Sequence, residues 1–223
     1  MSGKVFHEED YKIFDRLAKS KQPGPKGWAL IYMKKKLEFE GPNLVVAQGR
    51  EFVAQKIFGL YSTESSTRTN LTSHEITHFA IGGGGSEIES DSVTLVGPEI
   101  GDSGLYRPIG LGDSSYLDEP SSIEEGSLHT YENAVKSIST DGQRFLESVS
   151  YEGTSDWYTK VKCECVIPSG EPSQLDSDDS VKIDEAGLYL VDGSNVKMFS
   201  HICFPPKWKE KESDFEIHWY ILC

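Results

Sequence analysis

The chain has 223 residues, of which 37% are hydrophobic and 11% aromatic, and its formal net charge at pH 7 is −14. This composition predicts a folded protein with a substantial core, in one large domain or two small ones. The negative charge argues against binding to nucleic acid or to an anionic membrane, because both need a basic surface. No stretch approaches the roughly 20 apolar residues of a membrane span. The first residues also lack the apolar core of a secretion signal, so we expect folding in a cytoplasm.

The first elements predicted along the chain are a helix and a hairpin. Residues 6–21 carry Tyr11 and Phe14 at helical spacing, with acids early and lysines late, which favours a short amphipathic helix. Residues 28–41 have the composition of a hairpin or of a long edge strand. In the second case Lys34–Lys36 would blunt the edge, although such a basic run is usually a solvated face.

The next part of the chain predicts a compact unit followed by a long loop. Residues 43–46 are a brief apolar strand, and residues 48–58 have the spacing of a helix that buries one face and ends at Gly59. A further strand is predicted at residues 75–81. From there to about Glu132, in the stretch 82–132, glycine and proline recur. A loop of this length is uncommon in a compact domain, and it could be an arm that reaches a neighbouring subunit.

The last third predicts an all-β arrangement. Its strands are expected at residues 133–139, 144–153, 157–168, 187–191, 196–204 and 214–223. The first two should form a hairpin around the turn Asp141–Gly142. The third alternates, with Cys163 and Cys165 on its buried face. Short strands separated by turn residues are typical of an antiparallel sandwich or barrel. We therefore expect an α+β fold with an antiparallel β-sandwich core, one or two short helices near the N-terminus and a long extended loop.

Four consecutive glycines, Gly82–Gly85, follow the strand at 75–81. A phosphate-binding P-loop would continue with lysine and a hydroxyl residue, but Ser86 and Glu87 follow here. A dinucleotide-binding turn would need a glycine at Glu87, and the acids after it would repel phosphate. The run therefore predicts a structural role, in which glycine permits positive φ and close approach of two backbone segments.

The string His-Glu-x-x-His, from His74 through Glu75 to His78, matches a zinc-protease pattern. That pattern works only on a helix. On the strand predicted here the two histidines share a face but lie ~13 Å apart, too far to bind one ion. A zinc hydrolase that uses these three residues is accordingly the lesser alternative.

Two further metal sites are conceivable and disfavoured. One would combine Cys163, Cys165, His201 and Cys203, which lack the paired spacing of structural zinc sites. We expect these cysteines to be reduced thiols of the core. The other is an acidic loop with Asp176, Asp178 and Asp179, in which Val181 stands where a calcium-binding loop requires glycine. The sequence thus predicts no catalytic set, no cofactor and no metal.

Three pieces of sequence, in order, form a recognisable pattern. The first is Gly-Arg-x-x-x-Ala within residues 43–59, and the second is Ile-Gly-x-Gly at residues 81–84, followed by Leu95 and Glu99. The third comprises Glu185, Gly187, Leu188, Tyr189, the turn Asp192–Gly193, the step Phe204–Pro205, and Trp219. This order resembles a widespread group of tailed-bacteriophage virion proteins, which occur in collars, baseplates and tail-fibre attachment.

The resemblance implies a β-sandwich subunit without enzymatic residues, present in several copies around the tail axis. Its partners would be portal or neck, tail or fibre proteins, and it would be assembled in the host cytoplasm. We expect a neck, collar or baseplate component that mediates assembly or fibre attachment. Residues 1–42 lie outside the resemblance and are expected to be a docking element, while residues 43–223 form the structural domain.

A binding module is the other alternative. A β-sandwich could recognise carbohydrate on the host surface, with tryptophans as stacking platforms. The candidates are Trp28, Trp157, Trp208 and Trp219, and the competing expectation is that most of them belong to the core.

Overall fold

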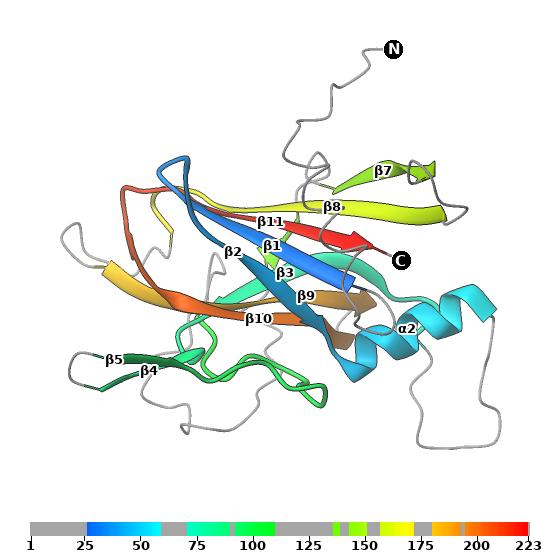
Figure 1. Ribbon diagram of the computed structural model, residues 1–223, viewed down its shortest axis with the longest axis horizontal. Helices are drawn as coiled ribbons and strands as arrows, with labels where there is room; N and C mark the ends of the chain where they lie inside the picture. Colours follow the sequence, from blue (N-terminus) through cyan, green and yellow to red (C-terminus); the bar gives the residue numbers. More distant parts are fainter. Residues whose placement is uncertain are drawn as a thin grey trace, which may run out of the picture.

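A computed structural model describes residues 26–58, 71–89, 92–109, 136–138, 143–150, 157–171, 180–192 and 195–222. These ranges hold one helix and eleven strands (Figure 1). The elements are β1 (Lys26–Met33), β2 (Lys36–Val45), α2 (Ala47–Phe58), β3 (Glu75–Gly82), β4 (Ser86–Glu89), β5 (Ser92–Leu95), β6 (Lys136–Ser137), β7 (Gln143–Ser150), β8 (Trp157–Ile167), β9 (Ser180–Asp192), β10 (Asn195–Glu210) and β11 (Phe215–Leu222). The expected helix at 6–21 lies outside the described residues.

Nine of the strands form one sheet in the order β6-β3-β9-β10-β2-β1-β11-β8-β7, and β4 and β5 form a separate pair. All pairings between these strands are antiparallel. Strands β2 and β10 pair over only two residues, and there the sheet turns back on itself, so that β1, β11 and β8 form one layer and β3, β9 and β10 the other (Figure 1). The fold is thus mainly an antiparallel, nearly closed sheet with one helix.

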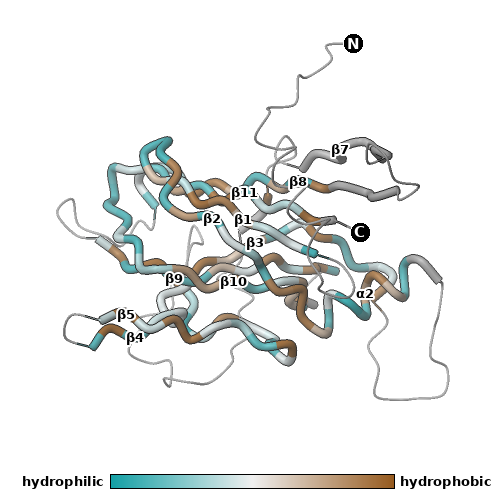
Figure 2. The backbone as a smooth tube through the Cα atoms, in the orientation of Figure 1, coloured by the Kyte–Doolittle hydropathy of each residue, from teal (hydrophilic) through white to brown (hydrophobic). Residues whose placement is uncertain are grey.

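The core fills the space between these two layers. Alternate residues of β11, from Phe215 to Ile221, point into it, and Cys163 and Cys165 of β8 do the same, as the sequence predicted. Facing them are Leu188 of β9 and its apolar neighbours on β3 and β10. The alternation is visible as short brown stretches along the strands (Figure 2). Helix α2, which the sequence also predicted, packs Phe52 edge-on against Phe199 of β10.

The hairpin predicted at residues 28–41 is confirmed, whereas the edge-strand alternative for it is wrong. Strand β1 pairs with β2 on one side and β11 on the other, so both hairpin strands lie inside the sheet. Lys34 and Lys35 form the turn, with φ of 49° and 63°. Successive left-handed residues suit a two-residue hairpin turn. Strand β2 continues past position 42, so residues 26–42 belong to the nine-stranded sheet. The expectation that residues 1–42 are a docking element stays a prediction.

The predicted hairpin around Asp141–Gly142 is wrong, although strands do lie on each side of that turn. Strand β6 pairs with β3, and β7 pairs with β8, which places them at opposite edges of the sheet. Local alternation and a turn dipeptide specify strands, but the choice of partner depends on apolar surface supplied by distant segments. The turn itself lies outside the described residues.

The stretch 82–132, expected as a loop or arm, contains regular structure in its described part. The hairpin of β4 and β5 is followed by residues 96–109, which we call the covering segment; both lie along the side of β9 and β10 that faces away from the core (Figure 1). Leu105 of this segment is fully buried there, against Tyr189 and Met198. Among the described residues, no helix has the length and apolar character needed to cross a membrane.

Candidate functional site

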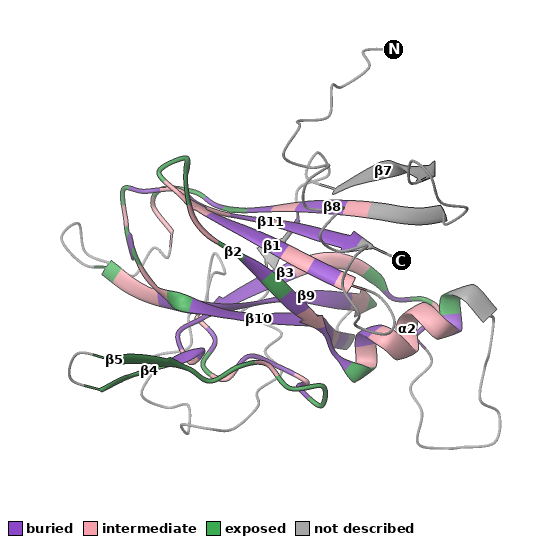
Figure 3. Ribbon diagram, viewed as in Figure 1, coloured by how far each residue is buried: buried purple, intermediate pink, exposed green. Residues whose placement is uncertain are grey.

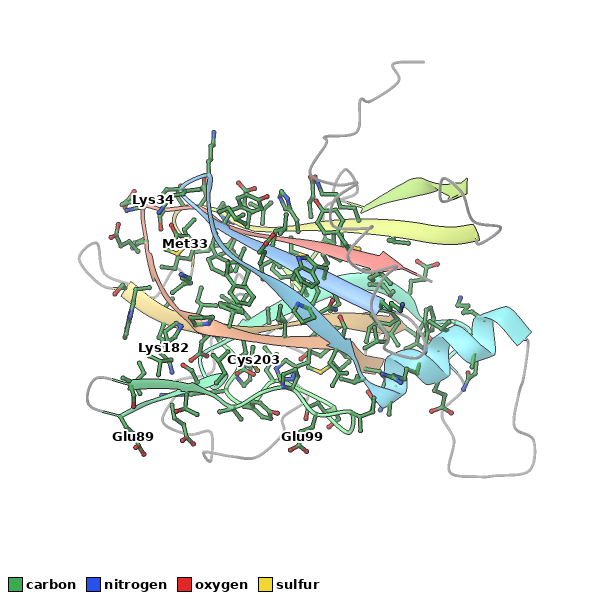
Figure 4. All side chains as sticks on the ribbon, viewed as in Figure 1. Met33, Lys34, Glu89, Glu99, Lys182 and Cys203 are labelled. Atoms are coloured by element: carbon green, nitrogen blue, oxygen red, sulfur yellow. The ribbon has the colours of Figure 1, made fainter. Side chains whose placement is uncertain are left out.

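A cluster of buried charged groups lies between the β9–β10 ladder and the covering segment. Glu185 of β9 stands opposite Cys203 of β10, and His201 stands opposite Gly187, so these side chains share the outer face of the sheet. Figure 4 places Cys203 between these strands and the covering segment, and Lys182 beside the base of the β4–β5 hairpin. Glu185 and His201 are completely buried. We call Asp102, Glu185, His201 and Cys203 the polar cluster.

His201 is held between two carboxylates. Its Nδ1 atom lies 2.6 Å from Oδ2 of Asp102, and its Nε2 atom lies 3.1 Å from Oε2 of Glu185. The ring of Tyr106 packs edge-on against the imidazole, with 5.1 Å between ring centroids. The Tyr106 hydroxyl lies 3.0 Å from the carbonyl oxygen of Gly97 and 3.3 Å from Oδ2 of Asp102, and these two acceptors share its single proton. A protonated imidazole therefore makes two charge-assisted hydrogen bonds, of which the one to Asp102 joins the sheet to the covering segment and the one to Glu185 links two neighbouring strands of the sheet.

Glu185 accepts hydrogen bonds on both carboxylate oxygens. The backbone amides of Gly84 and Arg107 donate to Oε1 over 3.0 Å and 2.7 Å, and that of Tyr106 donates to Oε2 over 2.9 Å. With His201, four donors surround one carboxylate. Buried charge is tolerated only when it is paired and hydrogen-bonded in this way. Glu185 thus fixes three backbone positions and offers no lone pair toward solvent.

A second buried carboxylate, Asp184, reaches the same glycine run. It accepts from the amide of Gly85 over 2.8 Å and from the Ser86 hydroxyl over 2.5 Å, and it pairs with Lys182 over 2.8 Å. Neighbouring strand residues normally point to opposite faces. Here the β9–β10 register shifts between Cys203 and Lys207, and the irregularity lets Asp184 and Glu185 act on one side.

Other backbone segments approach the four glycines closely, as the sequence predicted. A Cβ atom on Gly85 would lie 2.2 Å from the carbonyl oxygen of Asp184, and one on Gly84 would lie 2.8 Å from the amide nitrogen of Arg107. The other half of the prediction, positive φ in this run, is wrong. Among the described glycines, positive φ occurs at Gly97 and Gly170. The run serves contact with Asp184 and Glu185 rather than an unusual turn.

Protonation of His201 should make stability depend on pH. Burial by itself lowers the pKa of His201, but its hydrogen bonds to Asp102, Cys203 and Glu185 outweigh this and raise the pKa well above its ordinary value. A raised folded-state pKa contributes stability that is complete below about pH 6.5 and is lost as pH rises through the folded-state pKa. We expect the free energy of unfolding to fall by up to about 1.4 kcal/mol per pH unit above neutrality.

Urea unfolding between pH 6 and pH 8, below the ordinary pKa of a thiol, measures this slope, and His201→Gln should flatten it. His218→Gln is the matched control, because burial and Lys162 lower the pKa of His218. The contribution of His218 to the pH dependence of stability therefore lies below about pH 6.5. The His218→Gln variant should show the same decrease in the free energy of unfolding above neutrality as the wild type. An unchanged alkaline slope in His201→Gln would contradict the assignment.

Cys203, His201 and Asp102 lie in the order of a nucleophile, a base and an orienting acid. The Sγ atom of Cys203 is 3.8 Å from Nε2 of His201, but Glu185 already occupies that nitrogen. Cys203 is buried, and burial raises the pKa of its thiol although His201 opposes the shift. A reactive cysteine requires the opposite, a lowered pKa and access to a substrate. The geometry therefore supports a fixed ionic contact rather than an activated thiol.

Thiol labelling tests this interpretation. Burial raises the pKa of Cys163 to about 12 and that of Cys165 well above its ordinary value. We expect Cys163, Cys165 and Cys203 to resist alkylation at pH 8 in the folded protein and to react once the protein is unfolded in urea. Peptide mass spectrometry reads out each site separately. Rapid native labelling of Cys203, with Cys163 still protected, would instead favour an activated nucleophile.

The histidine pattern does not form the zinc-protease arrangement. Residues 75–82 form strand β3, so His74 and His78 lie along an extended segment and not on one helical turn. His74 is buried, and its ring nitrogens lack a hydrogen-bond partner within the described residues. Burial lowers the pKa of His78.

The four-residue cysteine and histidine set is also separated. Cys163 and Cys165 point into the core, whereas His201 and Cys203 lie in the polar cluster on the outer face. In the described ranges, no three histidine, cysteine or acidic side chains come together as a metal site. The acidic loop with Asp176, Asp178 and Asp179 lies outside those ranges.

Sequence reasoning did not find the polar cluster. Asp102 carried no signal, since it lies in a loop among other acids. Glu185 and His201 did carry one: each is a charged or titratable residue inside an otherwise apolar strand, in "IDEAGLYLV" and "FSHICF". Burying such residues costs free energy unless a hydrogen-bonding or charged partner reaches them.

The chain matches no protein-family model, no curated protein and no solved structure.

Proposed function

We propose that the chain is a structural subunit of a tailed-bacteriophage virion, part of the neck or collar or of the baseplate, which mediates assembly or fibre attachment. In this proposal the protein is not an enzyme. It is present in several copies around the tail axis, and its partners are portal, tail or fibre proteins. We interpret the nearly closed sheet as an α+β sandwich with α2 beside it.

One observation carries the proposal: residues of separate pieces of the phage-like pattern touch each other. Glu185 of the third piece accepts the amide of Gly84 in the second, although 101 positions separate them. The covering segment, which includes Glu99 of the Leu95–Glu99 element, supplies the Tyr106 and Arg107 amides to the same carboxylate. A pattern whose members meet in one fixed contact is expected of a scaffold.

The chemistry of the polar cluster agrees with a static role. Every oxygen of Glu185 and both nitrogens of His201 are engaged within the protein. Catalytic acids and bases need a partner from the substrate within hydrogen-bond reach, and here those positions are filled. The cluster therefore stabilises a shape instead of acting on a bound molecule.

Quantitative mass spectrometry of purified particles tests the proposal. We expect the chain in virions at a fixed ratio to the portal protein, and a tagged copy should localise to the neck or the baseplate by electron microscopy. A chain that is produced during infection and is absent from finished particles would refute the proposal.

A carbohydrate-binding module is the second candidate, and one observation favours it. The Trp208 side chain is 54% exposed on β10, as a sugar-stacking platform would be, whereas Trp219 is completely buried. Glycan-array binding that is lost in Trp208→Ala would support this function. A glycan array that shows no specific binding would exclude the carbohydrate-binding function.

A further inference from the structure

The β4–β5 hairpin carries apolar side chains on a face that the described residues cover only in part. Ile88 and Val93 are each 50% exposed and Leu95 is 44% exposed, and both strands are green over most of their length (Figure 3). We call Ile88, Val93 and Leu95, with Trp208, the hairpin face. Exposed apolar groups that gather in this way mark interaction sites on soluble proteins.

The strand register places these residues together. Leu95 stands opposite Ser86, and Val93 stands opposite Ile88, so all four point to one side of the hairpin. The Ser86 hydroxyl is bonded to Asp184, which identifies this side as the one turned toward β9 and β10. Trp208 stands opposite Lys182, whose ammonium reaches the Ser86 carbonyl, so the indole lies on the sheet surface that the hairpin faces.

The opposite side of the hairpin is acidic. Glu87 and Glu89 alternate with Ser86 and Ile88, and both are exposed. Glu89 points away from the sheet in Figure 4. The hairpin therefore presents an apolar face and an anionic face, separated by the thickness of one strand.

The hairpin also has free backbone edges in the described structure. Strands β4 and β5 pair only with each other, and an isolated two-stranded ribbon is marginally stable. Its base, by contrast, is fixed by Asp184 and by the hydrogen bond from the Val96 amide to the Gly85 carbonyl. A rigid base with an open edge is suited to strand addition, in which a partner segment extends the sheet.

We propose that an extended segment of a partner protein, with apolar and basic residues in alternation, adds to the edge of the β4–β5 hairpin. Its apolar residues cover the hairpin face against Trp208, and its basic residues lie on the side of Glu87 and Glu89. Period-two alternation in the partner is required because the two faces of the hairpin differ in character. This inference rests on the proposed function only in that the protein acts by docking, and it does not depend on which particle contains it.

Synthetic peptides test the inference on the full-length protein. The probe is a soluble heptapeptide of alternating lysine and valine. The comparison peptides alternate glutamate with valine or lysine with serine, and a fourth is the first peptide with alternate backbone nitrogens methylated. Titrations of isotope-labelled protein, followed by NMR, report the dissociation constant and the residues affected. We expect binding of the lysine–valine peptide alone, weakening as salt is raised.

Two neighbouring substitutions form the matched pair. Val93→Ser removes an apolar group from the hairpin face, and Thr94→Ser makes a similarly small change on the opposite side of the same strand. We expect Val93→Ser to weaken peptide binding tenfold or more and Thr94→Ser to leave it unchanged. Both sites are exposed, so both variants should keep the wild-type unfolding midpoint.

The inference is overturned if the lysine–valine peptide does not bind, or if it binds Val93→Ser as tightly as wild type. It also fails if the glutamate–valine or the methylated peptide binds equally well, because charge complementarity or backbone pairing would then be absent. A chain that binds the probe yet is absent from virions would contradict only the proposed function. A chain that is present in virions but does not bind the lysine–valine peptide would contradict only the present inference.

Discussion

Glu185→Ala should destabilise the protein by about 3–5 kcal/mol, the cost of removing one partner from a buried ion pair. The substitution would leave three backbone amides without their acceptor and His201 with one carboxylate instead of two. Unfolding by urea at pH 7 measures the effect. Glu89→Ala is the control, since Glu89 is exposed on β4, and it should change the free energy of unfolding by less than about 0.5 kcal/mol.

Glu185→Gln separates charge from shape. The amide group has nearly the volume of the carboxylate, but its nitrogen donates and cannot accept. It would therefore leave without an acceptor either the Gly84 and Arg107 amides or the Tyr106 amide and His201, depending on which oxygen it replaces. We expect a loss smaller than that of Glu185→Ala but still above 1 kcal/mol, in the range for an unsatisfied buried group. If both variants unfolded at the wild-type urea concentration, Glu185 would not be holding the covering segment.

Gly85→Ala is expected to cost about 3 kcal/mol, the upper part of the range for forcing a methyl group into a packed site. The added Cβ would lie 2.2 Å from the Asp184 carbonyl oxygen, a backbone atom that cannot rotate away. Relief requires separation of the glycine run from β9, which lengthens the hydrogen bonds of Asp184 and Glu185. Differential scanning calorimetry measures the drop in Tm.

Gly101→Ala provides the matched control for this substitution. Gly101 lies in the covering segment, and a Cβ there meets nothing within 4 Å. Alanine at such a position reduces the conformational freedom of the unfolded chain, so a change between zero and about 1 kcal/mol of stabilisation is expected. Equal effects at Gly85 and Gly101 would show that close approach is not what requires glycine.

The sequence predicted the elements of this fold better than their partners. Strand β8 alternates from Lys160 to Cys165, and helix α2 has apolar residues at helical spacing, so each pattern identifies its element locally. The pairing of β6 with β3 and of β7 with β8 depends on surfaces far apart in the chain, and no local pattern encodes it.

The polar cluster was predictable only in part, for a similar reason. Glu185 was conspicuous as an acid in an apolar strand, but the groups that donate hydrogen bonds to it are mostly backbone amides, which almost any residue can supply. Asp102 acquires its role solely because the covering segment places it beside His201. The glycines were correctly assigned to close approach because absence of a side chain is a property that sequence displays directly.

The sequence separations within the polar cluster have a consequence for the order of folding. Glu185 meets its amide donors across 101, 79 and 78 positions, and Asp102 meets His201 across 99. The chain loses entropy when it closes such long loops, and it does so before these contacts can stabilise it. We therefore expect folding to be slow and these contacts to form late on the pathway. Loss of Glu185 should then act mainly on the rate at which the native state opens, leaving the rate of its formation close to that of the unaltered chain.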